Sequence, residues 1–306
     1  MDIYEKYKKL EDLPVSTLVV EPDKWNTIKG VIHFVHGMCE HKGRYIHVIE
    51  YFKEKGYICV ISDLRGHGDN AMYLKDYGYF GENGHEILVE DIRAVNVFIK
   101  NTYPDFPVIM YAHSMGSLIV KNFLKKYDDE VDFVFLCGSP SNTLAKYLGL
   151  IVTEIQSVIF EDTEDANFIY KFINAYTSKN IKSDVPYAWI CSDNEVVEAF
   201  NDDEKCGFPF KINGYAALSR LLIGAYSKKG YKVQNKSLPI YFMAGKDDAV
   251  IGDVKHFKKQ KEFLNNLGYR RIGMRVFDNM RHEIHNEENK EEVFEYMLDK
   301  LNRHKM

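Results

Sequence analysis

Ser114 lies in the five-residue segment AHSMG (112–116), which follows the apolar run 108–111 and opens a stretch with helical periodicity. A serine on a sharp turn between a strand and a helix needs small residues two positions before and after it, because the two backbones approach closely there. Gly116 meets this need. Ala112 stands where glycine is usual and is the smallest side chain after glycine. The pattern predicts a nucleophilic serine.

A nucleophilic serine needs a histidine that removes its proton and a carboxylate that orients this histidine. The strand-like run 238–244 ends in a turn that contains Asp247 and Asp248, and the next such run, 273–277, is followed by His282. The loops after parallel strands meet at one edge of a sheet, where ligands bind. We therefore expect Ser114, one aspartate of this pair and His282 to lie together at that edge.

Acyl transfer also needs N–H groups that stabilise the negatively charged oxygen of its intermediate. In proteins with this type of turn, one donor is the N–H after the nucleophile and another comes from the loop after an earlier strand. The strand-like run 31–35 leads into His36 and Gly37, a turn that can direct the following N–H above the sheet. These positions nominate Met115 and Met38 as the oxyanion hole.

The elements that must position these residues alternate along most of the chain. Other strand-like runs are 58–61 and 133–137, and apolar residues recur at helical spacing within 45–52, 88–99, 120–127 and 294–301. Such alternation is typical of an α/β protein whose mostly parallel central sheet is covered by helices on both faces.

The alternation stops between residues 141 and 235. A structureless loop of this length is uncommon in a compact domain, and apolar residues recur at helical spacing within 148–159, 169–176 and 218–225. We expect a helical cap, 141–235, above Ser114 and His282, inserted between two core parts, 1–140 and 236–306. Its first helix, around 148–159, is apolar on more than one face. This helix either packs on two sides or forms part of a wall that binds an acyl chain.

Several motifs together resemble one family. The segments HGMCEH (36–41), DLRGHG (63–68), AHSMG (112–116) and GKDDAV (245–250) are similar to the HGxxEH, DxRGHG, elbow and GxxDxxV motifs of the monoacylglycerol lipase and lysophospholipase branch of the α/β-hydrolases, a serine-aminopeptidase-like group. The resemblance implies the α/β-hydrolase fold with an inserted helical cap. It also assigns the acid to Asp248 and places His282 in the catalytic-histidine loop MRHE (280–283).

Composition excludes several other classes of protein. A net charge of −5 over 306 residues is unfavourable for a nucleic-acid partner, which needs a basic face. Five cysteines without a CxxC pair indicate neither a disulfide framework nor a zinc site. We expect no metal and no organic cofactor. The charged first nine residues are not typical of a signal peptide, so we expect a cytoplasmic location. The sequence does not indicate the oligomeric state.

These features together predict a serine hydrolase that cleaves a small-molecule or lipid ester through an acyl-enzyme. The resemblance implies a monoacylglycerol or a lysophospholipid as the leading substrate, and the apolar cap agrees with a fatty acyl chain. Short-chain carboxylesterase activity is the main alternative, followed by peptidase activity and by a non-catalytic ligand-binding role. The apolar cap also predicts transient contact with a membrane surface.

Overall fold

A computed structural model describes residues 8–10, 13–24, 28–71, 76–142 and 161–304 of the chain. Eight strands form one sheet in the order β1-β2-β4-β3-β5-β6-β7-β8. Their bounds are β1 (Lys8–Leu10), β2 (Thr17–Val20), β3 (Gly30–Val35), β4 (Tyr57–Ser62), β5 (Val108–His113), β6 (Phe133–Cys137), β7 (Pro239–Gly245) and β8 (Arg271–Phe277).

The six strands from β3 to β8 are parallel, which confirms the expected sheet type. The sequence analysis did not predict β1 and β2, which pair antiparallel at one edge. Both strands are short, and a short edge strand is defined by its neighbour more than by its own pattern. β2 is held by its pairing with β4, from Thr17 opposite Ser62 to Val20 opposite Cys59.

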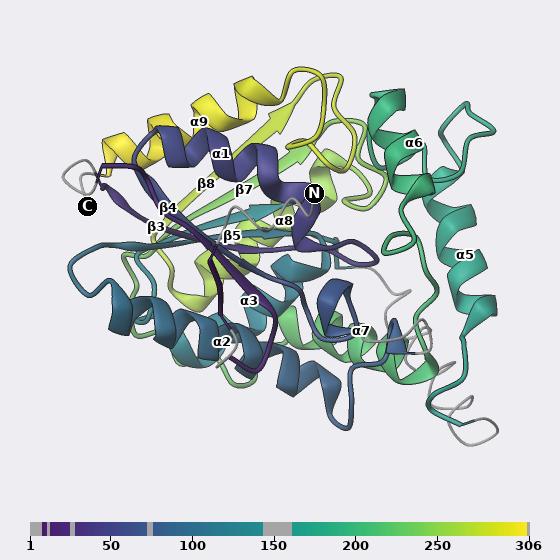
Figure 1. Ribbon diagram of the computed structural model, residues 1–306, viewed down its shortest axis with the longest axis horizontal. Coiled ribbons are helices and arrows are strands. Elements are labelled where there is room, and N and C mark those ends of the chain that lie inside the picture. Colours follow the sequence, from purple (N-terminus) through teal and green to yellow (C-terminus); the bar gives the residue numbers. More distant parts are fainter. Residues whose placement is uncertain (1–7, 11–12, 25–27, 72–75, 143–160, 305–306) are drawn as a thin grey trace.

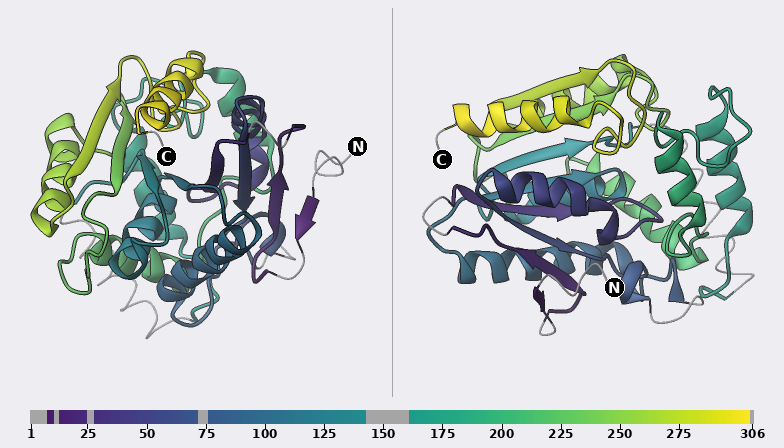
Figure 2. Two further views of the ribbon diagram at one scale, coloured as in Figure 1. Left: turned by 90° about the vertical axis from the view of Figure 1, so that its left-hand side faces the viewer. Right: turned by 45° about the horizontal axis from the view of Figure 1, so that its top comes forward.

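Helices cover both faces of the sheet (Figure 1 and Figure 2). α1 (Ile46–Glu54) and α9 (Lys290–Arg303) pack on one face, where they meet the side chains of Ile32 and Phe34. α2 (Gly84–Thr102), α3 (Met115–Tyr127) and α8 (Val254–Leu267) pack on the other face, against Val31 and Val35. Successive residues of β3 point to opposite faces, so its apolar run is buried on both sides.

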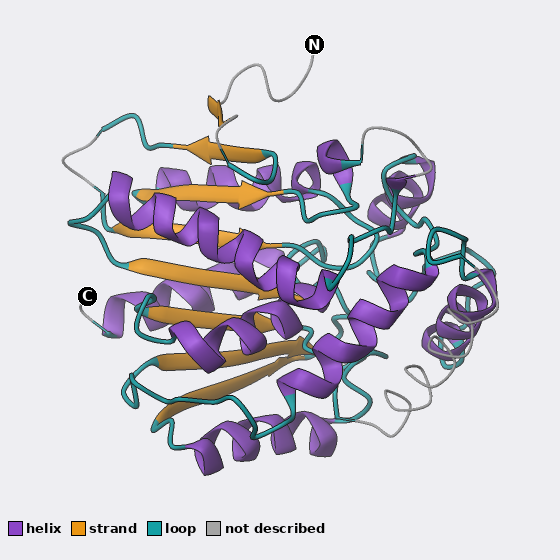
Figure 3. Ribbon diagram, turned by 90° about the horizontal axis from the view of Figure 1, so that it is seen from below, coloured by secondary structure: helices purple, strands orange, loops and turns teal. Residues whose placement is uncertain are grey.

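The segment between β6 and β7 contains α5 (Asn167–Ser178), α6 (Asn194–Asp202) and α7 (Ile212–Ala225). α5 and α6 lie beyond one end of the sheet (Figure 1). Figure 3 shows that the parallel strands point toward this end. α7 contacts α2 and α3 of the core. The helices expected within 169–176 and 218–225 are present. The helix expected around 148–159 lies outside the described residues, and the three-part division of the chain stays a prediction.

Within the described ranges, no helix has the length and apolar content needed to cross a bilayer.

Candidate active site

Ser114 lies on the turn that joins β5 to α3. Its backbone has φ +50° and ψ −118°, a strained conformation for a residue with a side chain. A Cβ atom at position 116 would lie 2.4 Å from the carbonyl oxygen of Val35 and 2.5 Å from that of His36. Gly116 therefore lets α3 approach β3 closely, which is the steric requirement that the sequence pattern predicted.

His282 contacts Asp248, one of the two candidate acids. Its Nδ1 lies 3.0 Å from each carboxylate oxygen of Asp248. Asp248 and His282 are both buried, whereas Asp247 is exposed. Asp248 also accepts a hydrogen bond of 2.8 Å from the backbone N–H of Val250, which fixes the orientation of its carboxylate. With its proton on Nδ1, the His282 ring has an unprotonated Nε2 that can act as a base.

The environment of His282 favours its protonated form. Burial by itself disfavours the imidazolium, but the charge of Asp248 and its hydrogen bonds, with contributions from Glu283 and Glu40, raise the pKa of His282 above its ordinary value of 6.5. A histidine that accepts a proton during a reaction benefits from a nearby carboxylate in this way.

Ser114 and His282 line a cavity of about 240 Å³ together with Met38 and Met115. The structure thus brings four of the five predicted site residues to one cavity and places the fifth, Asp248, against His282. The walls are mostly apolar and come from α5, α7 and the segment around α6. They include Tyr170, Ile173, Tyr187, Trp189, Ile190, Phe200, Leu218 and Leu222.

The two candidate oxyanion donors belong to different elements. Met115 is the first residue of α3, and the N-terminus of a helix favours negative charge. Met38 lies in the loop after β3, and its N–H makes no hydrogen bond to any described residue. Among the described residues, no backbone carbonyl accepts either N–H group, so both can donate to an oxyanion.

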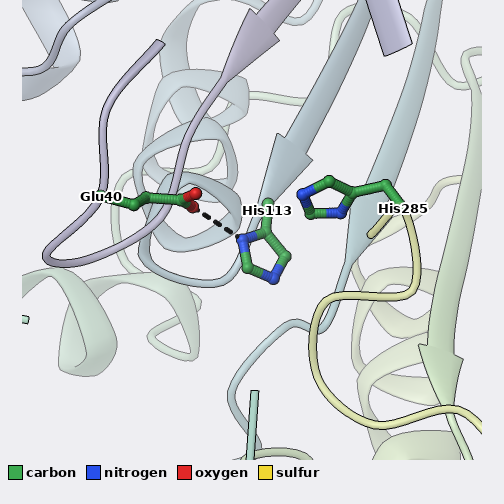
Figure 4. Close-up of side chains that lie close together, drawn as sticks. All are labelled: Glu40, His113 and His285. Carbon is green, nitrogen blue, oxygen red and sulfur yellow. Dashed lines mark hydrogen bonds and ion pairs between the residues drawn. The ribbon is translucent and has the colours of Figure 1, made fainter. Parts of the chain in front are cut away.

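Glu40 organises the loop after β3, a role that the sequence analysis did not assign. Its Oε1 accepts hydrogen bonds from the N–H of Gly37 at 2.5 Å, from Nδ1 of His113 at 3.0 Å and from the hydroxyl of Tyr45 at 3.1 Å. Figure 4 shows Glu40 facing His113, the residue before Ser114. The only sequence signal was the glutamate within the HGMCEH motif.

Arg44 joins Glu40 to the loop that carries His282. Its guanidinium lies 3.0 Å from Oε2 of Glu40 and makes two contacts of 2.6 Å with the carboxylate of Glu283. Burial alone would raise the pKa of Glu40, but the hydrogen bond and charge of His113 and the charge of Arg44 hold this pKa well below its usual range. Nε2 of His113 lies 3.3 Å from the backbone oxygen of His282.

Among the described residues, two groups of side chains have the residue types of a metal site, and hydrogen bonds already engage part of each group. In the group of Glu40, His113 and His285, the carboxylate already accepts hydrogen bonds on both oxygens, and Arg44 supplies a positive charge. In the group of His41, Asp203 and Cys206, Nδ1 of His41 accepts the N–H of Gly43. Nε2 of His41 therefore carries the proton and donates it to Asp203 at 2.8 Å.

Two curated relatives that match most of this chain are ester hydrolases. A monoacylglycerol lipase from Mycolicibacterium smegmatis is 25% identical over 264 residues, which cover 85% of this chain and 83% of the relative. A phospholipase, YtpA, from Bacillus subtilis is 24% identical over 267 residues, which cover 87% of this chain and 92% of the relative.

Solved structures show the same fold. A thermostable carboxyl esterase from Bacillus coagulans, in complex with glycerol, superposes with a TM-score of 0.89 at 24% identity and covers 98% of this chain and 99% of its own. A soluble variant of monoglyceride lipase from Saccharomyces cerevisiae superposes with a TM-score of 0.73 at 18% identity. The superposition covers 97% of this chain and 95% of the lipase chain. These likenesses confirm the α/β-hydrolase fold.

The family described as serine aminopeptidase, S33, matches residues 26–289. This match includes the turn of Ser114, the pair of Asp248 and His282, and the whole segment between β6 and β7. The chain therefore belongs to the serine aminopeptidase S33 family of α/β-hydrolases.

Proposed function

We propose that this protein, a carboxylic ester hydrolase, cleaves lipid monoesters such as monoacylglycerols or lysophospholipids, with Ser114 as its nucleophile. The observation that carries the proposal is the cavity of about 240 Å³, which has Ser114 and His282 in its lining and mostly apolar walls. Relatives that are a monoacylglycerol lipase and a phospholipase support the same substrate class.

The reaction proceeds in two acyl-transfer steps. Nε2 of His282 removes the hydroxyl proton of Ser114 as its oxygen attacks the ester carbonyl carbon, and Asp248 stabilises the resulting imidazolium. The N–H groups of Met38 and Met115 stabilise the oxyanion, an effect worth about 3 kcal/mol per donor in comparable enzymes. The intermediate collapses as the leaving alcohol takes the proton from His282. Water then repeats the attack on the acyl-enzyme and releases the fatty acid.

The walls of the cavity favour a fatty acyl chain over a short one. Ile173 of α5 and Leu218 and Leu222 of α7 line it. Each methylene that they remove from water contributes about 0.8 kcal/mol to binding. The cavity is less suited to a peptide with a free amino group, which needs an unpaired carboxylate. Among the described residues, the two acids that line it, Glu40 and Glu283, are both paired with Arg44.

A fluorophosphonate probe and a panel of esters test the proposal. We expect the probe to label Ser114, as located by peptide mapping, and the values of kcat/KM to rise with acyl length until the cavity is filled. Ser114→Ala should lose labelling and ester turnover while keeping its circular dichroism spectrum. Near-native turnover in this variant, with labelling elsewhere, for example at Ser139, would refute the nucleophile. A steady decline of kcat/KM from acetyl esters upward would favour a short-chain carboxylesterase.

The outer face of α5 fits transient contact with a lipid surface. Phe168 and Phe172 lie four residues apart on it with exposed fractions of 70% and 61%. Tyr176, four residues further along, is 58% exposed and also lines the cavity. Lys171 is exposed between Phe168 and Phe172. Aromatic rings beside lysine are typical of helices that lie in a membrane interface. A cap with this face would dock where lipid monoesters reside.

Co-sedimentation with phosphatidylcholine vesicles tests this contact. We expect the double variant Phe168→Ser with Phe172→Ser to bind less than the parent and to hydrolyse soluble esters equally well. Val97→Ser, at an exposed apolar position on α2, serves as the control. Equal sedimentation of the parent and the double variant would exclude α5 as the contact.

A further inference from the structure

The two N–H groups on either side of Met38 are both held by side chains. The N–H of Gly37 donates to Oε1 of Glu40 at 2.5 Å, and the N–H of Cys39 donates to Nε2 of His67 at 3.2 Å. The N–H of Met38, between them, has no acceptor among the described residues. Two fixed peptide groups therefore determine the direction of the N–H that we assign to the oxyanion hole.

Cys39 needs such support because its backbone is strained. Its φ of +55° lies in the left-handed region, which residues other than glycine adopt only when their surroundings hold them there. The carbonyl oxygen of Cys39 accepts a hydrogen bond of 3.0 Å from the N–H of Gly207. With its N–H bound to His67, both polar groups of the Cys39 backbone are engaged, which keeps the loop in this conformation.

The position and tautomer of His67 allow its Nε2 to accept the hydrogen bond from the N–H of Cys39. It follows β4 and lies just before the 3-10 turn Gly68–Asn70. Its Nδ1 lies 3.0 Å from the carbonyl oxygen of Arg65, which can only accept, so Nδ1 carries the proton and Nε2 is the acceptor. Its ring is fully buried, stacks on Phe80 at a centroid distance of 5.6 Å and meets Phe210 edge-on at 5.3 Å.

The charge state of His67 supports the same role. Burial, together with the neighbouring His36, lowers the pKa of His67 from 6.5 to about 3. The ring is therefore neutral at any pH near neutrality, and its Nε2 stays an acceptor for the N–H of Cys39.

We propose that His67 is a positioning residue for the reaction, which acts by fixing the Met38 N–H in the direction of the oxyanion. The inference rests on the proposed function, because it assigns a task to the oxyanion hole of that reaction. His67 does not line the cavity, so it acts through the loop after β3 and not by touching the substrate. Its contribution appears where negative charge develops on the substrate and not where the ester is merely bound.

A pair of amide variants tests the proposal. In His67→Gln the side-chain oxygen can take the place of Nε2 and accept the N–H of Cys39, whereas in His67→Asn the oxygen lies near the place of Nδ1 and cannot. We expect kcat of the Asn variant to fall roughly 10- to 100-fold, short of the loss of a whole oxyanion donor. The Gln variant should stay within about fivefold of the parent, with KM changed by less than about threefold in both.

Inhibitor binding separates positioning from loss of structure. A trifluoromethyl ketone with a fatty acyl chain forms a tetrahedral adduct, so its inhibition constant should rise by the same factor as kcat falls. The dissociation constant of the corresponding ether, which forms no adduct, should not change. His33→Phe is the control, because His33 is an equally buried histidine of β3 outside the loop. It should leave the ratio of the two constants unaltered.

Three results would overturn the inference: equal kcat in the Asn and Gln variants, weakening of both inhibitors by the same factor, or an altered ratio in His33→Phe. These results differ from a failure of the proposed function. That failure would appear as ester turnover by Ser114→Ala, whatever the His67 variants do.

Discussion

The loops at the end of the sheet and the helix α5 beyond them are stabilised by different kinds of contact. In the loops, Arg44 lies between Glu40 and Glu283, and all three side chains are at most 11% exposed. On α5, Phe172 is 61% exposed, while Ile173 lines the cavity. Groups that move protons need fixed positions, which buried charged hydrogen bonds provide. A surface that recognises a hydrocarbon chain needs apolar area, which is not directional.

This difference predicts that loop substitutions alter catalysis or folding for every substrate, whereas substitutions on the cavity-lining face of α5 alter the response to acyl length. The largest effect should come from the acid. Asp248→Asn should lower kcat by roughly 10³- to 10⁴-fold, because the tautomer of His282 is no longer enforced. Ester hydrolysis under saturating substrate measures it. Asp247→Asn, at the exposed neighbour, is the control, and a larger loss there would reverse the assignment.

The second effect concerns stability. Arg44→Met leaves the carboxylates of Glu40 and Glu283 buried without their cation, and we expect the free energy of unfolding to fall by about 3–5 kcal/mol. Urea denaturation measures it. Arg303→Met removes a pair with Asp299 whose arginine is 71% exposed, and it should cost less than about 1 kcal/mol. Similar losses in the two variants would mean that the buried cluster does not stabilise the loops.

The third effect is a pH dependence. His282 must be neutral to accept the serine proton, and its pKa is raised, chiefly by Asp248 acting against burial. As pH falls through this pKa, kcat/KM should therefore fall about tenfold per pH unit, with a midpoint above 6.5. The pH–rate profile of a soluble ester measures this midpoint. A midpoint at or below 6.5 in the parent protein would contradict the electrostatic role of Asp248.

The smallest effect should come from α5. Ile173→Ala should lower kcat/KM for a long-chain ester about fourfold, the equivalent of about one methylene of lost contact, and leave acetyl esters unchanged. Phe172→Ala, on the exposed face of the same helix, is the matched control when the ester is monomeric in solution, because the role proposed for Phe172 is at a lipid surface. If Ile173→Ala slowed acetyl and long-chain esters equally, α5 would belong with the catalytic loops, and the comparison between the two regions would fail.

Much of the core was predictable because its signals are local. The turn at Ser114 needs Gly116 for a close approach of backbones, and this requirement is visible within five residues of sequence. The parallel strands β3, β4, β5 and β6 carry mostly apolar runs because they are buried on both faces. His282 could be located at the end of the sheet because it follows the strand-like run that forms β8.

Tertiary structure alone decided the contacts between distant segments. From the residues alone either Asp247 or Asp248 could face His282, and the choice depends on which side chain the turn after β7 directs inward. Arg44 and Glu283 are 239 residues apart in the chain, and the sequence around neither residue predicts its contact with the other. Likewise, the acceptor for the Cys39 N–H comes from the turn after β4. A backbone pattern predicts the element that carries a side chain, but a hydrogen bond depends on distances of a few tenths of an ångström between elements. The packing of the whole sheet sets those distances.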